Sequence, residues 1–237
     1  MKTAIIDSRV PPSAERELMK RGFSVIRAVP SSRLPAPLSS HPDMLTCLIG
    51  STLISSADYV EEAPAFFYDL ACATHLNFEI TADEFKTDYP FDCIFNALVI
   101  GDKIFCKTDS VGRGVIRTAE RIGKKIVNTN QGYPACTVLA LDEGHAITAD
   151  LGMARILEKE GIDVCLIENG DISLPPYEYG FIGGAAGVAD EVVYFLGNPS
   201  KHRDGQKILD YIAAVGLRTI ALIDAPLADF GKIIFCE

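Results

Sequence analysis

The chain has 237 residues, 48% of them hydrophobic, and a formal net charge of −10. Asp and Glu outnumber Lys and Arg by 32 to 22, and the basic residues form no dense cluster, which argues against a nucleic-acid partner. No apolar run is long enough to span a bilayer, and Asp7 interrupts the apolar start too early for a signal peptide, so we expect no membrane contact and a cytoplasmic location.

The first predicted elements are a strand at Thr3–Asp7, a helix near Ser13–Arg21 that Gly22 ends, and a strand at Ser24–Val29. This first unit has one strand fewer than the units that follow it. We expect Lys232–Cys236 to supply the missing strand by pairing with the N-terminal strand, which would also remove an exposed sheet edge.

Four further units repeat the order strand, strand, helix, strand, with short turns between the first two strands. In chain order, their predicted elements are strands Met44–Ile49 and Thr52–Ser55 with a helix around Tyr59–Ala73; strands Cys93–Ile100 and Lys103–Lys107 with a helix from Asp109 or Ser110 and a strand Ile126–Val127; strands Cys136–Leu141 and His145–Ala149 with a helix from Asp150 and a strand Asp163–Ile167; and strands Phe181–Val188 and Glu191–Leu196 with a helix opened by Asn198–Ser200 and a strand Thr219–Ile223.

A short polar residue stands between strand and helix in each unit. These residues are Asp58, Asp109, Asp150 and Asn198, at gaps of 51, 41 and 48 positions, and Asp7 follows Asn198 by 46 when the count continues from the C-terminus into the N-terminus. A period in this range is typical of one repeated supersecondary unit, which must pack against its neighbours to bury its apolar faces. We therefore predict one domain, residues 1–237, whose five units form a ring; the alternative is an open, irregular α/β sheet.

Five units of this kind in a ring resemble the pentein fold, the five-fold pseudo-symmetric α/β propeller of the guanidino-group-modifying enzymes, over the whole chain. The resemblance indicates an uncharacterised bacterial branch of that family. It implies chemistry in which a cysteine attacks the guanidinium carbon, a histidine moves protons and carboxylates hold the cation. Because the family also has a non-catalytic branch that binds ribosomal subunits, the fold alone leaves catalysis open.

Counting back from the helix caps aligns the N-terminal ends of the five first strands. One column then holds His41, Asp92, Tyr133, Phe181 and Asp229. In the pentein enzymes the functional residues lie at these strand ends around the pseudo-five-fold axis. The resemblance therefore implies a small-molecule ligand at the axis.

The family's motif positions hold other residues in this chain. Asn96 stands where the acidic motif has aspartate, and the motif's glycines are absent from Phe91–Asn96. Tyr133 stands where the family has its histidine, and Ile233–Ile234 stand where it has its nucleophile. Cys236 is two residues beyond Ile234 and would point to the same face of the sheet.

The most informative local cluster is His41-Pro42-Asp43. Proline biases the preceding residue toward an extended conformation, so His41 and Asp43 could face the same way. His41 would then be a general base, and Asp43 a carboxylate that orients it or binds a cation. The alternative is a turn that opens a strand and carries a polar histidine.

Each of the other candidate residues also has a structural alternative. Asp92 stands at the start of a predicted apolar strand. It either binds a cation or is an acid that is exposed or paired with another side chain. Asn96 interrupts the same strand and needs buried partners or a ligand. Cys136 and Cys236 are candidate nucleophiles or structural thiols.

Two sequence patterns bound the site further. The seven cysteines form no C-x-x-C pair, which is typical of free thiols in a reducing compartment. Without such paired ligands we expect no metal site. We also expect no cofactor. Gly183, Gly184 and Gly187 interrupt the strand Phe181–Val188, which indicates close backbone packing at the axis or contact with a ligand.

Two classes of function follow. The first is a Cys/His-dependent hydrolase, deiminase or amidinotransferase that acts on a C–N bond of a guanidino or amidine compound. The second is a non-catalytic protein on the same fold that binds a small molecule or another protein. The sequence leaves a homo-oligomer open.

Overall fold

The structure is a computed structural model that describes residues 2–86 and 88–237. Within these ranges the strands form five three-stranded sheets, a mixed α/β arrangement. In spatial order the sheets are β17 (Ile234–Cys236), β1 (Thr3–Asp7) and β2 (Ser24–Ala28); β3 (Cys47–Ile49), β4 (Thr52–Ser56) and β5 (Asn77–Thr81); β6 (Leu98–Ile100), β7 (Lys103–Cys106) and β8 (Lys125–Asn128); β9 (Val138–Ala140), β10 (His145–Thr148) and β11 (Asp163–Leu166); and β13 (Ala186–Ala189), β14 (Val192–Phe195) and β15 (Arg218–Ala221).

One short strand pair and the helices complete the described elements. The pair is β12 (Ile172–Ser173) with β16 (Leu227–Ala228), in parallel. The helices are α1 (Pro12–Lys20), α2 (Pro42–Leu45), α3 (Ala57–Glu62), α4 (Pro64–Ala73), α5 (Arg113–Arg121), α6 (Pro134–Thr137), α7 (Leu151–Lys159), the 3-10 helix η1 (Pro199–Lys201) and α8 (Gly205–Ala214). No helix in the described part of the chain has the length and apolarity needed to cross a membrane.

All five three-stranded sheets have the same topology. The first strand is antiparallel to the middle strand, and the middle strand is parallel to the third. The chain ends share one sheet, as expected, with Thr3 opposite Cys236. The sheets remain separate from one another and form no single closed sheet.

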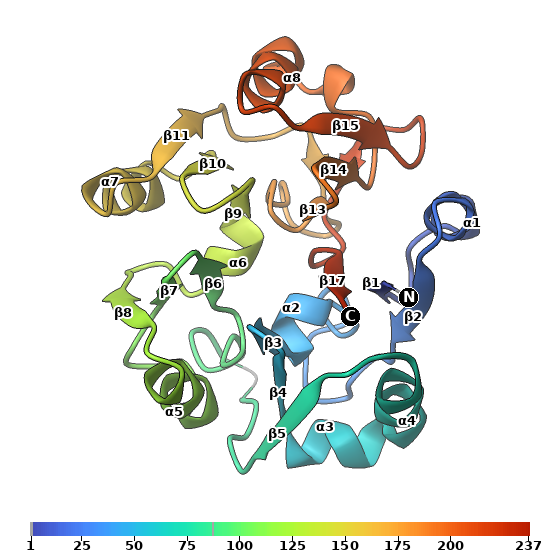
Figure 1. Cartoon of the computed structure of the whole chain (residues 1–237), viewed down its shortest axis with the longest axis vertical. Coiled ribbons are helices and arrows are strands. Elements are labelled where there is room, and N and C mark those ends of the chain that lie inside the picture. The colour runs from blue at the N-terminus through green and yellow to red at the C-terminus, as the bar shows by residue number, and fades with distance from the viewer. Residues whose placement is uncertain (1, 87) are drawn as a thin grey trace.

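Figure 1 shows the first strands β3, β6, β9, β13 and β17 nearest the centre of the molecule, with the long helices at the periphery. Neighbouring units pack through apolar side chains. Phe105 of β7 lies in one buried cluster with Leu157 of α7, and Leu18 of α1 lies in another with Tyr194 of β14. This packing buries the apolar face that each small unit leaves uncovered.

The first strands begin later than the sequence indicated. The predicted strands Met44–Ile49 and Cys136–Leu141 start as the helices α2 and α6, and residues 93–97 and 181–185 precede β6 and β13 as turns and loops. Pro42 and Pro134 explain the two helices, because proline suits the first helical position, where its missing N–H has no partner to lose. In these turns and helices the side chains do not alternate between two faces as they would in a straight strand.

The helix caps were predicted only in part. Asp150 caps α7 by accepting from the Met153 N–H at 2.9 Å, as expected. Asp109 does not cap α5; instead the carboxylate of Asp83 accepts from the Arg113 and Gly114 N–H groups at 3.0 and 2.8 Å.

The second unit shows two further differences. Ser56 rather than Asp58 caps α3. The single helix expected over Tyr59–Ala73 is divided into α3 and α4 at Pro64. Proline has no backbone N–H to donate and its ring clashes with the carbonyl of the preceding turn, so the helix ends before it.

Candidate functional site

A cavity of about 340 Å³ collects most of the aligned column of strand ends. His41, Tyr133, Phe181 and Asp229, four of the five column residues, line it. The remaining lining residues come from the loop before α2, from α2, from α6 and from the loop after β12; they are Leu38, Met44, Cys136, Leu174, Tyr177, Glu178 and Tyr179. The cavity therefore has aromatic walls, two carboxylates, an imidazole and a thiol.

The thiol of Cys136 is held by two side chains from other units. Its S–H donates to Asp43 Oδ2 at 2.9 Å, and Asn96 Nδ2 donates to Cys136 Sγ at 3.1 Å. Asn96 also accepts from the Ala135 N–H at 2.8 Å and donates to the Asp43 carbonyl at 3.3 Å. Asn96 thus fixes α2 and α6 relative to each other, and this explains the polar residue in an apolar segment.

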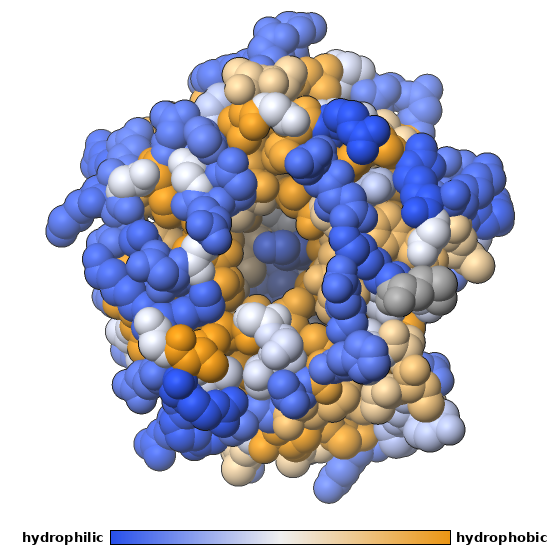
Figure 2. Space-filling view, in the orientation of Figure 1, coloured by the Kyte–Doolittle hydropathy of each residue, from blue (hydrophilic) through white to orange (hydrophobic). Residues whose placement is uncertain are grey.

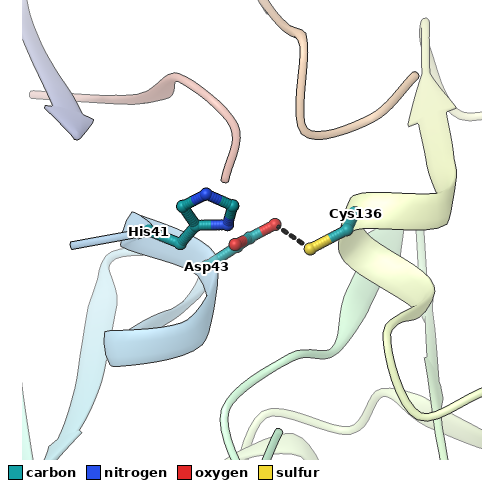
Figure 3. A group of neighbouring side chains, drawn as sticks. All are labelled: His41, Asp43 and Cys136. Atoms are coloured by element: carbon teal, nitrogen blue, oxygen red, sulfur yellow. Dashed lines mark hydrogen bonds between the residues drawn. The ribbon is translucent and has the colours of Figure 1, made fainter. Parts of the chain in front are cut away.

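The imidazole of His41 is fully buried between two carboxylates. Its Nε2 lies 3.9 Å from Asp7 Oδ2, and its Nδ1 lies 4.0 Å from Asp229 Oδ1. Neither ring nitrogen has a hydrogen-bond partner among residues 2–86 and 88–237. Figure 3 shows the imidazole, the Asp43 carboxylate and the Cys136 thiol converging from α2 and α6, and their ligand-type atoms all lie within 4.8 Å of one another.

Burial dominates the protonation of this cluster. It raises the pKa of Asp43 to about 6, against the hydrogen bond from Cys136, which lowers it. It raises the pKa of the Cys136 thiol well above the ordinary value, and the nearby Asp43 carboxylate adds to that shift. Burial lowers the pKa of His41, opposed by Asp229 and Asp7. The resting cluster therefore favours a neutral thiol and a neutral imidazole.

Glycines create the space around these groups. A Cβ on Gly231, which has a φ of +68°, would overlap His41, and a Cβ on Gly184 would overlap the Asp229 carboxylate. Gly183 lies against the backbone carbonyls of α6 and β9. Close packing beside the cavity therefore explains the glycine-rich segment.

The other predicted site residues lie outside the cavity lining. Asp92 is buried behind Tyr133 and accepts from its hydroxyl at 2.6 Å, so Asp92 orients a wall of the cavity. Burial raises the pKa of Asp92 above its ordinary value, against the Tyr133 hydrogen bond. Cys236 lies in β17, where its S–H donates to the Thr3 carbonyl at 3.7 Å, and it does not join the cluster of Cys136.

Three parts of the chain that lie at this site were not predicted from the sequence: Asp7, Tyr177–Tyr179 and Lys232. Asp7 was interpreted as a helix cap, but it is fully buried, accepts from the Arg9 guanidinium at 2.6 Å and faces His41. Tyr177–Tyr179 line the cavity from the loop that follows β12. Pro175 and Pro176, which precede this segment, are the signal in the sequence that indicates a loop here.

Lys232 is the third missed residue. It has a φ of +74° and lines a second cavity, of about 230 Å³, together with Asp43 and residues of the first strands. Figure 2 shows a hollow at the centre of one face of the molecule, with hydrophobic residues along much of its rim and a hydrophilic residue deep inside. Burial lowers the pKa of Lys232, opposed by Asp43. The hydrogen bond between Asp43 and Cys136 thus lies between the two cavities.

Solved structures with the same fold are enzymes that act on guanidino compounds. DDAH (dimethylarginine dimethylaminohydrolase) from Pseudomonas aeruginosa, complexed with citrulline, superposes with a TM-score of 0.59 at 11% identity, covering 94% of this chain and 91% of that chain. The N-terminal domain of the cyanobacterial arginine dihydrolase ArgZ gives a TM-score of 0.56 at 12% identity, covering 93% and 90%. Inosamine-phosphate amidinotransferase StrB1 from Streptomyces griseus gives 0.53 at 16% identity, covering 94% and 79%.

These likenesses establish a pentein fold, since all three are pentein enzymes, and at such identities they establish the fold alone. No curated protein matches the chain by sequence. A family model described as "Family of unknown function (DUF6873)" matches residues 5–234.

Proposed function

This chain belongs to the family of unknown function DUF6873, and we propose that it is a pentein-type enzyme that cleaves or transfers a C–N bond of a small guanidino or amidine compound, with Cys136 as its nucleophile. The observation that carries the proposal is the hydrogen bond of 2.9 Å from the Cys136 thiol to Asp43, at the wall of a cavity that contains carboxylates.

We also propose that the five units form a pseudo-five-fold α/β propeller in one domain. The shared topology of the five three-stranded sheets, the pairing of the chain ends and the central position of the first strands in Figure 1 support this arrangement. In such a ring the cavity lies at one end of the axis.

The chemistry of the cavity favours a cationic ligand. Glu178 and Asp229 contribute carboxylates, and none of the described residues that line the cavity is Lys or Arg. The rings of Tyr133, Tyr179 and Phe181 add π-faces, which attract cations. A planar guanidinium or amidinium matches both kinds of group, since it can donate to carboxylates in its plane and stack on rings across it.

Asp43 is placed to activate the thiol. In the proposed first step, Asp43 Oδ2 takes the proton of Cys136 while the sulfur bonds to the central carbon of the ligand. The electron pair of the C=N bond moves to the nitrogen. Asn96 Nδ2 keeps its hydrogen bond to the sulfur during this step. The pKa of about 6 at Asp43 supports this role, because such a carboxylate is ionised at neutral pH and more basic than an ordinary one.

His41 is placed to serve the leaving group. The proton that Asp43 took from Cys136 passes to the departing amine, directly or through the neighbouring imidazole of His41, the C–N bond breaks and a thiouronium-type adduct on Cys136 remains. In a hydrolase, water then attacks the carbon of the adduct and gives a proton to His41, the C–S bond breaks, and the departing sulfur of Cys136 takes that proton back; in a transferase, an amine takes the place of water. This proposal differs from the sequence hypothesis in one role: Asp43, which contacts the thiol, takes the thiol proton in place of His41.

The test is selective alkylation of the native chain. 2-Chloroacetamidine, a cation, and 2-chloroacetamide, its neutral analogue, are applied separately and the labelled cysteines are mapped by mass spectrometry. We expect Cys136 to react with the cation at least about tenfold faster than with the neutral reagent, a difference of about 1.4 kcal/mol in transition-state binding. The exposed Cys72 provides the internal control and should show no such preference.

The Cys236→Ser variant should keep the labelling pattern, and Cys136→Ser should lose it. Equal and slow labelling of Cys136 by both reagents would contradict a thiol enzyme. That result would favour the second candidate, a protein that binds a cationic small molecule without reacting. One observation supports this candidate: burial and Asp43 disfavour the Cys136 thiolate.

A further inference from the structure

The converging side chains of His41, Asp43 and Cys136 offer a nitrogen, an oxygen and a sulfur to one point. All three residues are buried, and their ligand-type atoms lie within 4.8 Å of one another (Figure 3). This combination of donors is the one that zinc takes in proteins, with bonds of about 2.0–2.3 Å. Donor atoms around such an ion are separated by roughly 3–4 Å, so a closure of about 1 Å would bring all three atoms within bonding distance of one ion.

Several donor atoms in this cluster lack a partner. Both nitrogens of His41 and Asp43 Oδ1 are buried without a hydrogen bond among the described residues. Buried polar atoms are nearly always satisfied, so three such atoms in one cluster point to a ligand that binds there.

We propose that His41, Asp43 and Cys136 bind one Zn²⁺ ion, with the fourth position open to the cavity. The surrounding charges favour a dication. Whichever nitrogen of His41 binds the ion, the other faces a carboxylate, Asp7 beside Nε2 or Asp229 beside Nδ1. Carboxylates in this position orient histidine ligands in metal sites. Lys232, which interacts with Asp43 from the second cavity, opposes the ion and moderates its affinity.

The zinc-bound state and the nucleophilic state exclude each other. Zinc binding removes the thiol proton to solvent and places the sulfur in the metal shell, where it cannot attack carbon. Zinc would therefore act as a reversible block of the reaction at Cys136, and this part of the inference rests on the proposed function. The existence of the site does not depend on it.

Stoichiometry tests the site directly. The full chain, in a Cys72→Ser background that removes the exposed thiol, is freed of metal with a chelator and dialysed against Zn²⁺. We expect one bound equivalent, loss of that equivalent in Cys136→Ser and in His41→Ala, and retention in Cys236→Ser, where a buried thiol outside the cluster is changed. Zinc should also raise the melting temperature of every chain that binds it. Binding that survives in Cys136→Ser would overturn the proposal.

Co²⁺ can be used to identify the ligand atoms by spectroscopy, without any substitution at His41, Asp43 or Cys136. Co²⁺ in the same background should produce a thiolate-to-metal charge-transfer band, and X-ray absorption should find one sulfur in its shell. A shell of nitrogen and oxygen alone would overturn the proposal even if the cluster variants fail to fold.

Alkylation separates this inference from the proposed function. In the wild-type chain, saturating Zn²⁺ should slow labelling of Cys136 by 2-chloroacetamidine at least about tenfold and leave Cys72 unchanged. A chelator should restore the rate. Zinc bound with unaltered labelling of Cys136 would overturn the exclusion, whereas zinc bound to a chain whose Cys136 never reacts would contradict only the proposed function.

Discussion

Cys136 and Cys236 are both buried free thiols next to a short strand, but their surroundings differ. Cys136 contacts the side chains of Asp43 and Asn96, belongs to a helical turn and reaches a cavity. Cys236 lies within the paired strand β17 and makes one long contact with a backbone carbonyl. Burial raises the pKa of Cys236 to about 11, and within the described part of the chain its thiol donates to a backbone carbonyl and to no side chain.

The comparison shows what makes a buried thiol a candidate for chemistry. Burial alone stabilises the neutral thiol in both places. A neighbouring base, a second polar side chain and open space for a ligand distinguish Cys136. These features come from other units of the fold, so residue type and strand position could not separate the two cysteines.

Removing the base should test this comparison most strongly. In Asp43→Asn the amide keeps the shape of the side chain but cannot accept the thiol proton as a base. We expect labelling of Cys136 by 2-chloroacetamidine to fall at least about 100-fold, the lower end of general-base effects. Asp92→Asn, which changes a buried carboxylate bonded to Tyr133, is the matched control and should change the rate much less. Equal rates in Asp43→Asn and wild type would remove Asp43 from the mechanism.

The polar support of Cys136 should also be visible in stability. Asn96→Ala leaves the Ala135 N–H and the Asp43 carbonyl without their buried partner. We expect the free energy of unfolding in urea to fall by about 1–3 kcal/mol. Asn77→Ala changes an exposed asparagine in β5 and should cost less than about 0.5 kcal/mol. A loss at Asn96 no larger than that at Asn77 would show that the cluster is not fixed by this side chain.

Removing a negative charge at the rim of the cavity should have a smaller effect on the reaction of Cys136. Glu178 is exposed, so replacing it with Gln removes at most about 1 kcal/mol of attraction for a cation. The preference of Cys136 for the cationic over the neutral reagent should fall by up to about fivefold, and Glu168→Gln, away from the cavity, should leave it unchanged. A preference that rises in Glu178→Gln would contradict a cation-binding cavity.

The smallest effect concerns Asp92, on the wall behind Tyr133. Burial raises its pKa above the ordinary 3.8, so the folded chain binds more protons than the unfolded chain between the two values. Stability contributed by the protonated form is therefore lost as the pH rises through that window. Asn cannot ionise, and Asp92→Asn should gain stability relative to wild type from acidic to neutral pH, as urea unfolding at several pH values would reveal. A difference that is constant with pH, or of the opposite sign, would show that Asp92 has no raised pKa.

The sequence by itself determined the local elements and their repetition. Alternating apolar residues, short turns and helix-ending glycines such as Gly123 and Gly161, which have positive φ, act over a few residues and can be read directly. The column of strand ends also followed from counting, because the units have similar lengths. Four of its members indeed line one cavity.

Only the tertiary structure decided which of these residues meet. Cys136 and Asp43 are 93 residues apart, and their contact depends on two proline-initiated helical turns that the pattern presented as strands. Asp7, Asp229 and Lys232 reach the same region because the two ends of the chain pair in one sheet. Local sequence preferences fix the units, but the contacts between units depend on packing over the whole chain, where a shift of one residue changes the face to which a side chain points.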